Sequence, residues 1–222
     1  MLKAVLIDYT GTTVQEGGES LKTAVGLTVA HSDFSSPEEF IAYWWKLVRQ
    51  YESESYADTF RSEDDILHAC FLSLEKTHHL RWDIPELERL TKQWWSCPPL
   101  FADTPAFFAG CPYPICMVSN NGAQYVGAGM AHYGLRPAGI VSGEMACAYK
   151  PHREIFEKAL EISGCTPEEV VHIGDSYNSD IVGAHSAGIT KTILVSRRGG
   201  EKHDDTIVVG GLDEALREVL KM

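Results

Sequence analysis

The feature that most constrains this chain is an alternation of short apolar runs with longer amphipathic segments. The apolar runs lie at residues 3–8, 114–119, 139–141, 170–175, 192–196 and 206–209. Helical patterns lie at residues 123–133, 152–162, 179–187 and 212–220. Short apolar runs rich in β-branched residues are typical of strands buried on both faces. The alternation therefore predicts an α/β fold with a Rossmann-like three-layer core, in which helices cover both faces of a central parallel sheet.

One long segment interrupts this alternation, because residues 19–96 contain no run that resembles a strand. Two helix-start patterns, each a serine followed by acidic residues, occur at residues 36–39 and 62–65. We therefore expect three or four amphipathic helices here, inserted after the first strand of the sheet. The expected domains are an α/β core at residues 1–14 and 98–222 and a helical insert at residues 15–97.

The charge of the chain limits its partners. Its 222 residues carry a formal net charge of −12, which argues against nucleic acids and anionic membranes, since both require clustered Lys and Arg. A small anion can still bind at a locally positive site. No apolar run reaches membrane-spanning length, and the cysteines show no CxxC pattern. We therefore expect a cytoplasmic protein with reduced thiols and no membrane anchor, either a monomer or a homodimer.

Polar residues follow several of the expected strands. In a parallel α/β sheet the carboxyl ends of the strands meet at one edge, where binding sites form. The residues expected at this edge are Asp8, Thr10, Ser119, Asn120, Lys150, Asp175 and Asp180. Gathered carboxylates repel one another unless a cation lies among them, and a lysine with a hydroxyl beside them suits an anionic substrate group. The pattern therefore predicts a metal-dependent phosphoryl-transfer site.

Four segments of the chain resemble the four motifs of the haloacid dehalogenase-like (HAD) hydrolases. They are LIDYTGT at residues 6–12, MVSN at 117–120, YKPHREIF at 149–156 and HIGDSYNSDIVGAHSAG at 172–188. The helical insert lies where subfamily I of that family carries its small helical (C1) cap. The resemblance implies a Mg²⁺-dependent phosphatase that acts on a small phosphorylated metabolite.

The resemblance also implies how the substrate is held. Asp8 attacks the phosphorus atom and forms an aspartyl-phosphate intermediate. Ser119 and Lys150 bind the phosphoryl oxygens, with further donors from the backbone amides that follow Asp8 and Asn120. Arg49, in the insert, is expected to contact the rest of the substrate.

The implied metal site uses residues from the first and last motifs. Its ligands are the carboxylates of Asp8 and Asp175 and the backbone carbonyl of Thr10. Asp180 either binds through a metal-bound water or holds Lys150. The cation is needed because nucleophile and substrate are both negative, and their repulsion must be offset.

This chain departs from the family pattern at one catalytic position. Most phosphatases of the family carry a second aspartate two residues after the nucleophile, and it serves as general acid and base. Thr10 occupies that position here and cannot transfer protons near neutral pH. The residues expected at the catalytic positions are Asp8, Thr10 and Lys150. Because Thr10 cannot act as the acid and base, we expect either slow hydrolysis or a proton shuttle supplied by the cap.

Three other functions can be compared with this prediction. The 2-haloacid dehalogenases of the family need no metal and lack the counterpart of Asp175, so the presence of Asp175 argues against dehalogenation. Phosphonoacetaldehyde hydrolase, which cleaves a C–P bond, has an opening motif similar to DYTGTTV at residues 8–14, but it needs a cap lysine. Lys22 and Lys46 are the lysines early in the insert, and neither lies in a matching motif. The third alternative is a phosphate-binding regulatory protein with degenerate catalysis, which the threonine at position 10 favours.

Overall fold

The strands form at the predicted apolar runs. The computed structural model describes residues 1–200 and 202–222, and its six-stranded sheet is parallel throughout, in the order β3-β2-β1-β4-β5-β6. The strands are β1 (Ala4–Ile7), β2 (Ile115–Ser119), β3 (Gly139–Ser142), β4 (Val170–Gly174), β5 (Thr192–Val195) and β6 (Ile207–Val209). The central strand β1 pairs with β2 and β4, so the loops that follow these three strands lie together at one edge.

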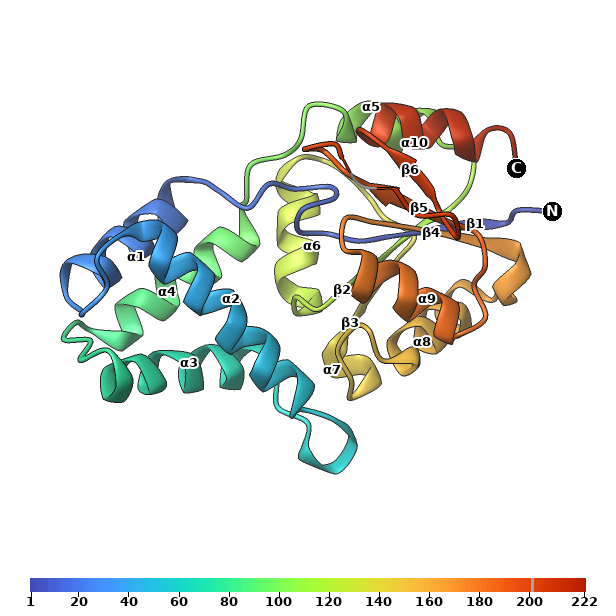
Figure 1. The fold of residues 1–222 in the computed structure, drawn as a ribbon. Helices are drawn as coiled ribbons and strands as arrows, with labels where there is room; N and C mark the ends of the chain where they lie inside the picture. The colour runs from blue at the N-terminus through green and yellow to red at the C-terminus, as the bar shows by residue number, and fades with distance from the viewer. Residues whose placement is uncertain (201) are drawn as a thin grey trace.

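Helices cover both faces of the sheet because alternate side chains of each strand point to opposite sides. Val5 and Ile7 pack into one hydrophobic cluster with α5, α6 and α10, whereas Leu6 packs into another with α8 and α9. These helices are α5 (Thr104–Gly110), α6 (Ala123–His132), α8 (Arg153–Ser163), α9 (Gly183–Ser186) and α10 (Leu212–Val219). Figure 1 shows α5 and α10 on one side of the sheet and α8 and α9 on the other. The predicted three-layer α/β fold is confirmed.

The insert after β1 is helical, as predicted. Its helices are α1 (Glu19–Ala30), α2 (Pro37–Ser53), α3 (Glu63–Thr77) and α4 (Ile84–Ser96), with a 3₁₀ turn at Ala57–Thr59. Both expected helix starts are present: Ser36 accepts a hydrogen bond from the backbone N–H of Glu39, and Ser62 forms a capping box with Asp65. These hydrogen bonds satisfy backbone donors that a helix N-terminus otherwise leaves unpaired.

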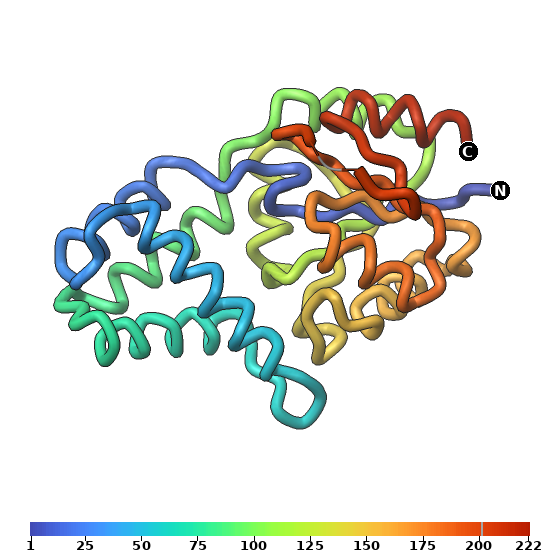
Figure 2. Tube along the Cα trace, viewed as in Figure 1, coloured from blue at the N-terminus to red at the C-terminus, as the bar shows by residue number. Residues whose placement is uncertain are grey.

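The insert supplies nearly all residues of a further hydrophobic cluster, among them Leu67, Phe71 and Leu87, and Tyr149 of the core joins them. The two segments that join it to the core run side by side, and Gln15 donates its backbone N–H to the carbonyl of Pro99 at 2.8 Å (Figure 2). Because the insert is internally packed and doubly connected, we propose residues 15–97 as a cap domain on a core of residues 1–14 and 98–222.

Two short helices, α5 and α7 (Gly143–Ala146), occur where the sequence shows no clear pattern. They contain too few turns to display a helical period. The helical pattern predicted at residues 179–187 is present as a π-helical segment (Tyr177–Val182) that continues into α9. In the described part of the chain no helix combines the length and the apolarity that crossing a membrane requires.

Candidate active site

Asp8 lies directly after the central strand, at the edge of the sheet that faces the insert. Its side chain is buried, and one carboxylate oxygen, Oδ1, accepts a hydrogen bond from Lys150 Nζ at 2.5 Å. The other oxygen, Oδ2, is buried without a hydrogen-bond partner among the described residues. A buried carboxylate oxygen is costly when unpaired, so this atom requires a ligand that the protein itself does not supply.

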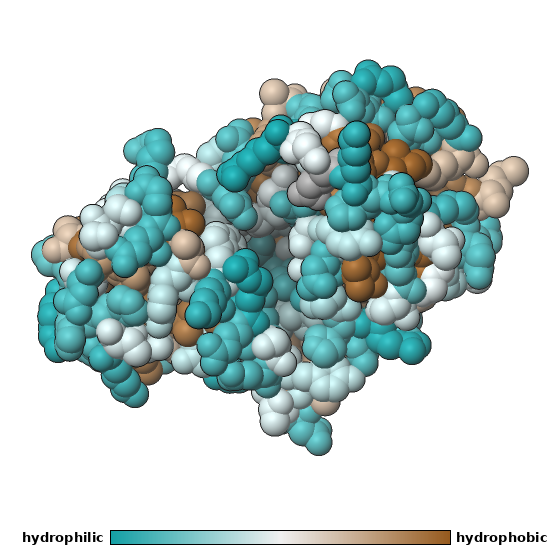
Figure 3. Space-filling model, in the orientation of Figure 1, coloured by the Kyte–Doolittle hydropathy of each residue, from teal (hydrophilic) through white to brown (hydrophobic). Residues whose placement is uncertain are grey.

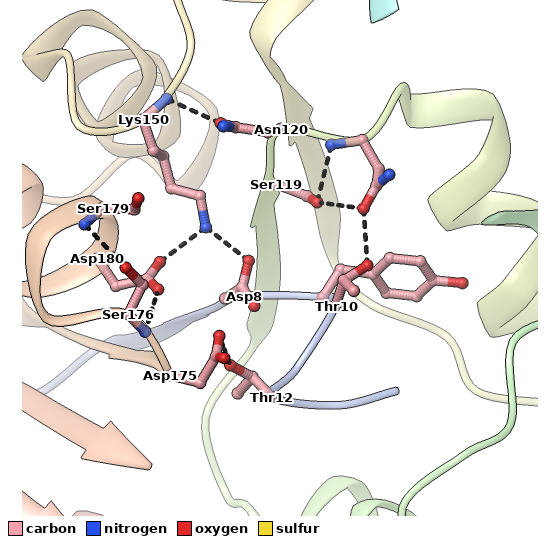
Figure 4. A network of polar contacts seen from close by, with 12 residues as sticks. Asp8, Thr10, Thr12, Ser119, Asn120, Lys150, Asp175, Ser176, Ser179 and Asp180 are labelled. Carbon is pink, nitrogen blue, oxygen red and sulfur yellow. Dashed lines mark hydrogen bonds and ion pairs between the residues drawn. The ribbon is translucent and has the colours of Figure 1, made fainter. Parts of the chain in front are cut away.

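Lys150 joins Asp8 to a second buried carboxylate. Its ammonium group also contacts Asp180 Oδ1 at 2.7 Å (Figure 4). His172 Nε2 lies 3.1 Å from the same oxygen. Burial by itself lowers the pKa of Lys150, but the charges of Asp180 and Asp8 outweigh it, and the net shift is upward. Burial by itself raises the pKa of Asp180, and Lys150 and His172 reverse the effect. Lysine and aspartate therefore remain a charged pair.

Asp175 is the third carboxylate of the group, in the loop after β4. Thr12 Oγ1 donates to its Oδ1 at 3.3 Å. Burial, followed by the negative charges of Asp8 and Asp180, raises the pKa of Asp175 to about 8. Because one lysine cannot neutralise three carboxylates, the site lacks positive charge.

The three aspartates fit a divalent cation. Each of Asp8, Asp175 and Asp180 offers a carboxylate oxygen, and these oxygens all lie within 4.8 Å of one another. Hard cations such as Mg²⁺ prefer oxygen ligands of this kind. The unpaired Oδ2 of Asp8 and the raised pKa of Asp175 both indicate the same missing positive charge.

Gly11 allows the first and last motifs to approach closely. Its φ is +90°, and a Cβ atom at this position would overlap the carboxylate of Asp175. We expect Gly11→Ala to lower stability by about 1–2 kcal/mol from the backbone conformation alone and to weaken Mg²⁺ binding by displacing Asp175. Gly17→Ala is the matched control, because nothing lies within 4 Å of the point that its new methyl group would occupy. Thermal unfolding with and without Mg²⁺ measures both effects, and equal melting temperatures for the two variants would contradict this role of Gly11.

The loop after β2 connects the other motifs. Asn120 Oδ1 accepts the backbone N–H of Lys150 at 2.8 Å, and Ser119 Oγ accepts the backbone N–H of Asn121 at 3.1 Å. Thr10 donates its hydroxyl to Asn121 Oδ1 at 2.8 Å. The sequence did not single out Asn121, which fixes the side chain of Thr10 against the serine loop.

A cavity of about 420 Å³ lies between core and insert. Figure 3 shows the molecular surface hollowed between these two parts. Every residue that the sequence predicted for the site lines this cavity: Asp8, Thr10, Arg49, Ser119, Asn120, Lys150, Asp175 and Asp180. Its remaining wall combines aliphatic and polar residues with the aromatic side chains of Trp44, Trp45, Trp94, Trp95 and Tyr149. The cavity is therefore polar at the sheet edge and largely apolar under the insert.

Three acidic residues of the insert, Glu16, Glu52 and Glu63, also line the cavity, and the sequence did not identify them. Glu63 accepts hydrogen bonds from Asn121 Nδ2 and from the backbone N–H of Gly122, both at 2.6 Å. Glu52 accepts one from Asn120 Nδ2 at 3.1 Å. The only available signal for Glu52 was its spacing of three residues from Arg49, which places both on one face of α2.

Comparison with known proteins places most of the chain in one family, whereas the individual curated relatives match parts of it. The family model for haloacid dehalogenase-like hydrolases matches residues 2–188. A glyceraldehyde 3-phosphate phosphatase from Methanothermobacter thermautotrophicus is 39% identical over 74 residues, which cover 33% of this chain and 32% of the relative. The pyrophosphatase PpaX from Bacillus cereus is 51% identical over 47 residues, 21% of each chain. The matches thus span about a third or less of the length of these curated relatives.

Solved structures match the entire fold. The L-2-haloacid dehalogenase from Xanthobacter autotrophicus superimposes with a TM-score of 0.80 and 19% identity, over 100% of both chains. The HAD-hydrolase YfnB from Bacillus subtilis, bound to magnesium, gives a TM-score of 0.78 and 17% identity, over 99% of both. Identities this low show a shared fold alone. Together with the family model and the four motifs at the cavity, they establish that this chain belongs to the haloacid dehalogenase-like hydrolases.

Proposed function

We propose that this hydrolase is a Mg²⁺-dependent phosphatase that acts on a small phosphorylated metabolite through an aspartyl-phosphate on Asp8. The observation that carries the proposal is the environment of this carboxylate. One of its oxygens is held by Lys150, and the other is buried and unpaired beside Asp175 and Asp180. A phosphate group is anionic, so it would meet a carboxylate nucleophile only where positive charge offsets their repulsion.

The chain's own residues would divide the work as follows. Asp8 attacks the phosphorus atom, and the bond to the leaving oxygen breaks as the aspartyl-phosphate forms. Lys150 and Ser119 hold the phosphoryl oxygens, and Arg49 contacts the rest of the substrate. Mg²⁺, held by Asp8, the carbonyl of Thr10 and Asp175, would supply charge neutralisation when bound. Asp180 would keep Lys150 in position, in keeping with their 2.7 Å contact.

The names of the relatives favour phosphate chemistry. One matched protein is a phosphatase and the other a pyrophosphatase. The dehalogenases share the fold at low identity, but the sequence pattern distinguishes them by the absence of an Asp175 counterpart. The three-carboxylate cluster that includes Asp175 therefore favours metal-dependent phosphoryl transfer over dehalogenation.

Cleavage of a C–P bond finds less support. That reaction needs a cap lysine, and Lys22 is exposed and pairs with Glu19 on the surface of α1. Among the described residues that line the cavity, Lys150 is the only lysine. Its ammonium group already forms ion pairs with two carboxylates, so it is not free to form a Schiff base. Lys46 does not line the cavity.

A substrate panel tests the proposal. We expect hydrolysis of several phosphomonoesters with Mg²⁺ and a loss of about 10³-fold or more in EDTA, since metal catalysis contributes several kcal/mol. Phosphonoacetaldehyde should remain intact under both conditions. Release of inorganic phosphate measures all reactions. Cleavage of phosphonoacetaldehyde alone would favour the C–P hydrolase, and phosphate binding without turnover of any ester would favour the regulatory alternative.

A further inference from the structure

The leaving oxygen of a phosphate ester needs a proton, and Thr10 is badly placed to provide one. Its hydroxyl donates to Asn121 Oδ1 at 2.8 Å, and an alcohol does not titrate near neutral pH. The aspartates at the sheet edge are occupied by Lys150 or belong to the proposed metal site. A proton donor must therefore come from elsewhere on the cavity wall.

Four further residues that could donate a proton line the cavity, namely Glu16, Glu52, Glu63 and Tyr149. Three of them are poorly suited to protonate the leaving oxygen. Both carboxylate oxygens of Glu63 accept hydrogen bonds from the loop before α6. Tyr149 donates its hydroxyl to the carbonyl of Arg61, and burial raises its pKa further above neutrality. Partial burial and the charge of Asp8 raise the pKa of Glu16 as well, but this side chain is exposed on the connecting segment, and no hydrogen bond from the loop after β2 holds it, in contrast to Glu52. Glu52 is the group that remains.

Glu52 is held at the cavity by the loop that carries the phosphate-binding residues. Its Oε1 accepts from Asn120 Nδ2 at 3.1 Å, and the same Asn120 accepts the backbone N–H of Lys150. No described residue forms a hydrogen bond with Oε2 of Glu52. One oxygen therefore fixes the side chain, and the other is available to a substrate or a water molecule.

The surroundings of Glu52 suit proton transfer at neutral pH. Burial raises its pKa to about 7, although Asn120, Lys150 and Arg49 act in the opposite direction. Of the other groups that face it, Glu63 interacts with it electrostatically, as do Tyr149 and Cys70. A general acid and base is most effective when its pKa lies near the working pH.

We propose that Glu52 is the general acid and base of this enzyme, in place of the aspartate that Thr10 replaces; the inference rests on the proposed phosphatase function. As Asp8 forms its bond to phosphorus, the bond to the ester oxygen breaks, and the neutral carboxyl of Glu52 gives its proton to that oxygen. The resulting carboxylate then takes a proton from a water molecule as its oxygen attacks the phosphorus. The bond between Asp8 and phosphorus breaks, inorganic phosphate leaves, and both carboxyl groups return to their starting states.

Glu52→Gln tests this role, because glutamine keeps the size and the acceptor of the side chain but cannot exchange a proton. On an alkyl phosphate, whose leaving group needs protonation, we expect kcat/KM to fall about 10²–10⁴-fold. On p-nitrophenyl phosphate, whose leaving group departs as a stable anion, the fall in the first step should be far smaller. Wild-type kcat/KM for the alkyl ester should decline as pH rises through about 7, the pKa of Glu52, and this decline should be absent in the variant.

Glu54→Gln is the matched control, since Glu54 lies two residues further along and is exposed. This substitution should change neither kcat/KM for the two esters nor its dependence on pH. Wild-type protein that hydrolyses neither ester, nor any other phosphomonoester, would refute the phosphatase function itself. Active wild type combined with an equal loss, or no loss, on the two esters in Glu52→Gln would refute the role of Glu52 alone.

Discussion

Replacement of Asp8 by asparagine is expected to abolish turnover of every phosphate ester that the wild-type protein hydrolyses. The amide is nearly isosteric, but it is not a nucleophile and brings no negative charge to Lys150. Loss of a covalent nucleophile typically removes most of an enzyme's catalysis, so we expect kcat to fall at least about 10⁴-fold. Steady-state release of phosphate from the best substrate of the panel measures the effect.

The Asp8 variant should remain folded, which separates chemistry from stability. Lys150 keeps its 2.7 Å contact with Asp180, so the buried ammonium group retains a partner. The variant should therefore still unfold in a cooperative thermal transition, and binding of Mg²⁺ should weaken because one of three clustered carboxylates is gone. Substantial activity in this variant would remove Asp8 from the role of nucleophile.

Asp175→Asn is expected to have opposite effects on stability and on activity. Without divalent metal, burial and the charges of Asp8 and Asp180 raise the pKa of Asp175, so the folded state carries the cost of keeping this carboxyl neutral near pH 7. Asparagine removes that cost, so the melting temperature should rise. With Mg²⁺, the variant should lose the stabilisation that ligand binding gives the wild type. Activity should fall about 10³-fold or more, because the contribution of the metal is lost. Thermal unfolding in EDTA and over a Mg²⁺ titration measures the first two effects.

Asp213→Asn provides the matched control for this change. Asp213 is exposed at the start of α10, where it pairs with Arg217 at 3.5 Å. The same substitution there should alter neither the response to Mg²⁺ nor the rate. If Asp175→Asn retains the full stabilisation by Mg²⁺, the carboxylate cluster is not the metal site.

Much of the fold could be predicted because its determinants are local. The run Val170–Gly174 is apolar throughout most of its length and buried, so its sequence alone indicates an interior strand. Ser62 and Asp65 specify a helix start within four residues. The order of the strands depends instead on which apolar faces pack together, and no short segment encodes that choice. The short helices α5 and α7 were missed for the related reason that they contain too little periodicity.

The core residues of the site could be predicted for the same reason, because their positions are set by the local sequence of the strands. Asp8, Ser119 and Asp175 each end or follow a strand of one parallel sheet, which brings them to one edge whatever the strand order. In the insert, Arg49 could be predicted but Glu52 could not, because the contact between Glu52 and Asn120 joins residues 68 positions apart. Such a contact depends on how the insert packs on the core. An acidic residue on an amphipathic helix otherwise resembles any solvated surface charge.

The central claim is that Asp8 forms a covalent bond to phosphorus during turnover, and it can be measured directly. The wild-type protein is mixed with its best substrate and Mg²⁺, quenched in acid during turnover and treated with borohydride, which reduces an acyl phosphate to an alcohol. Peptide mass spectrometry then locates the reduced side chain. We predict homoserine at position 8, and no such product in Asp8→Asn. Rapid turnover with an unmodified Asp8, or reduction at a different carboxylate, would contradict the claim.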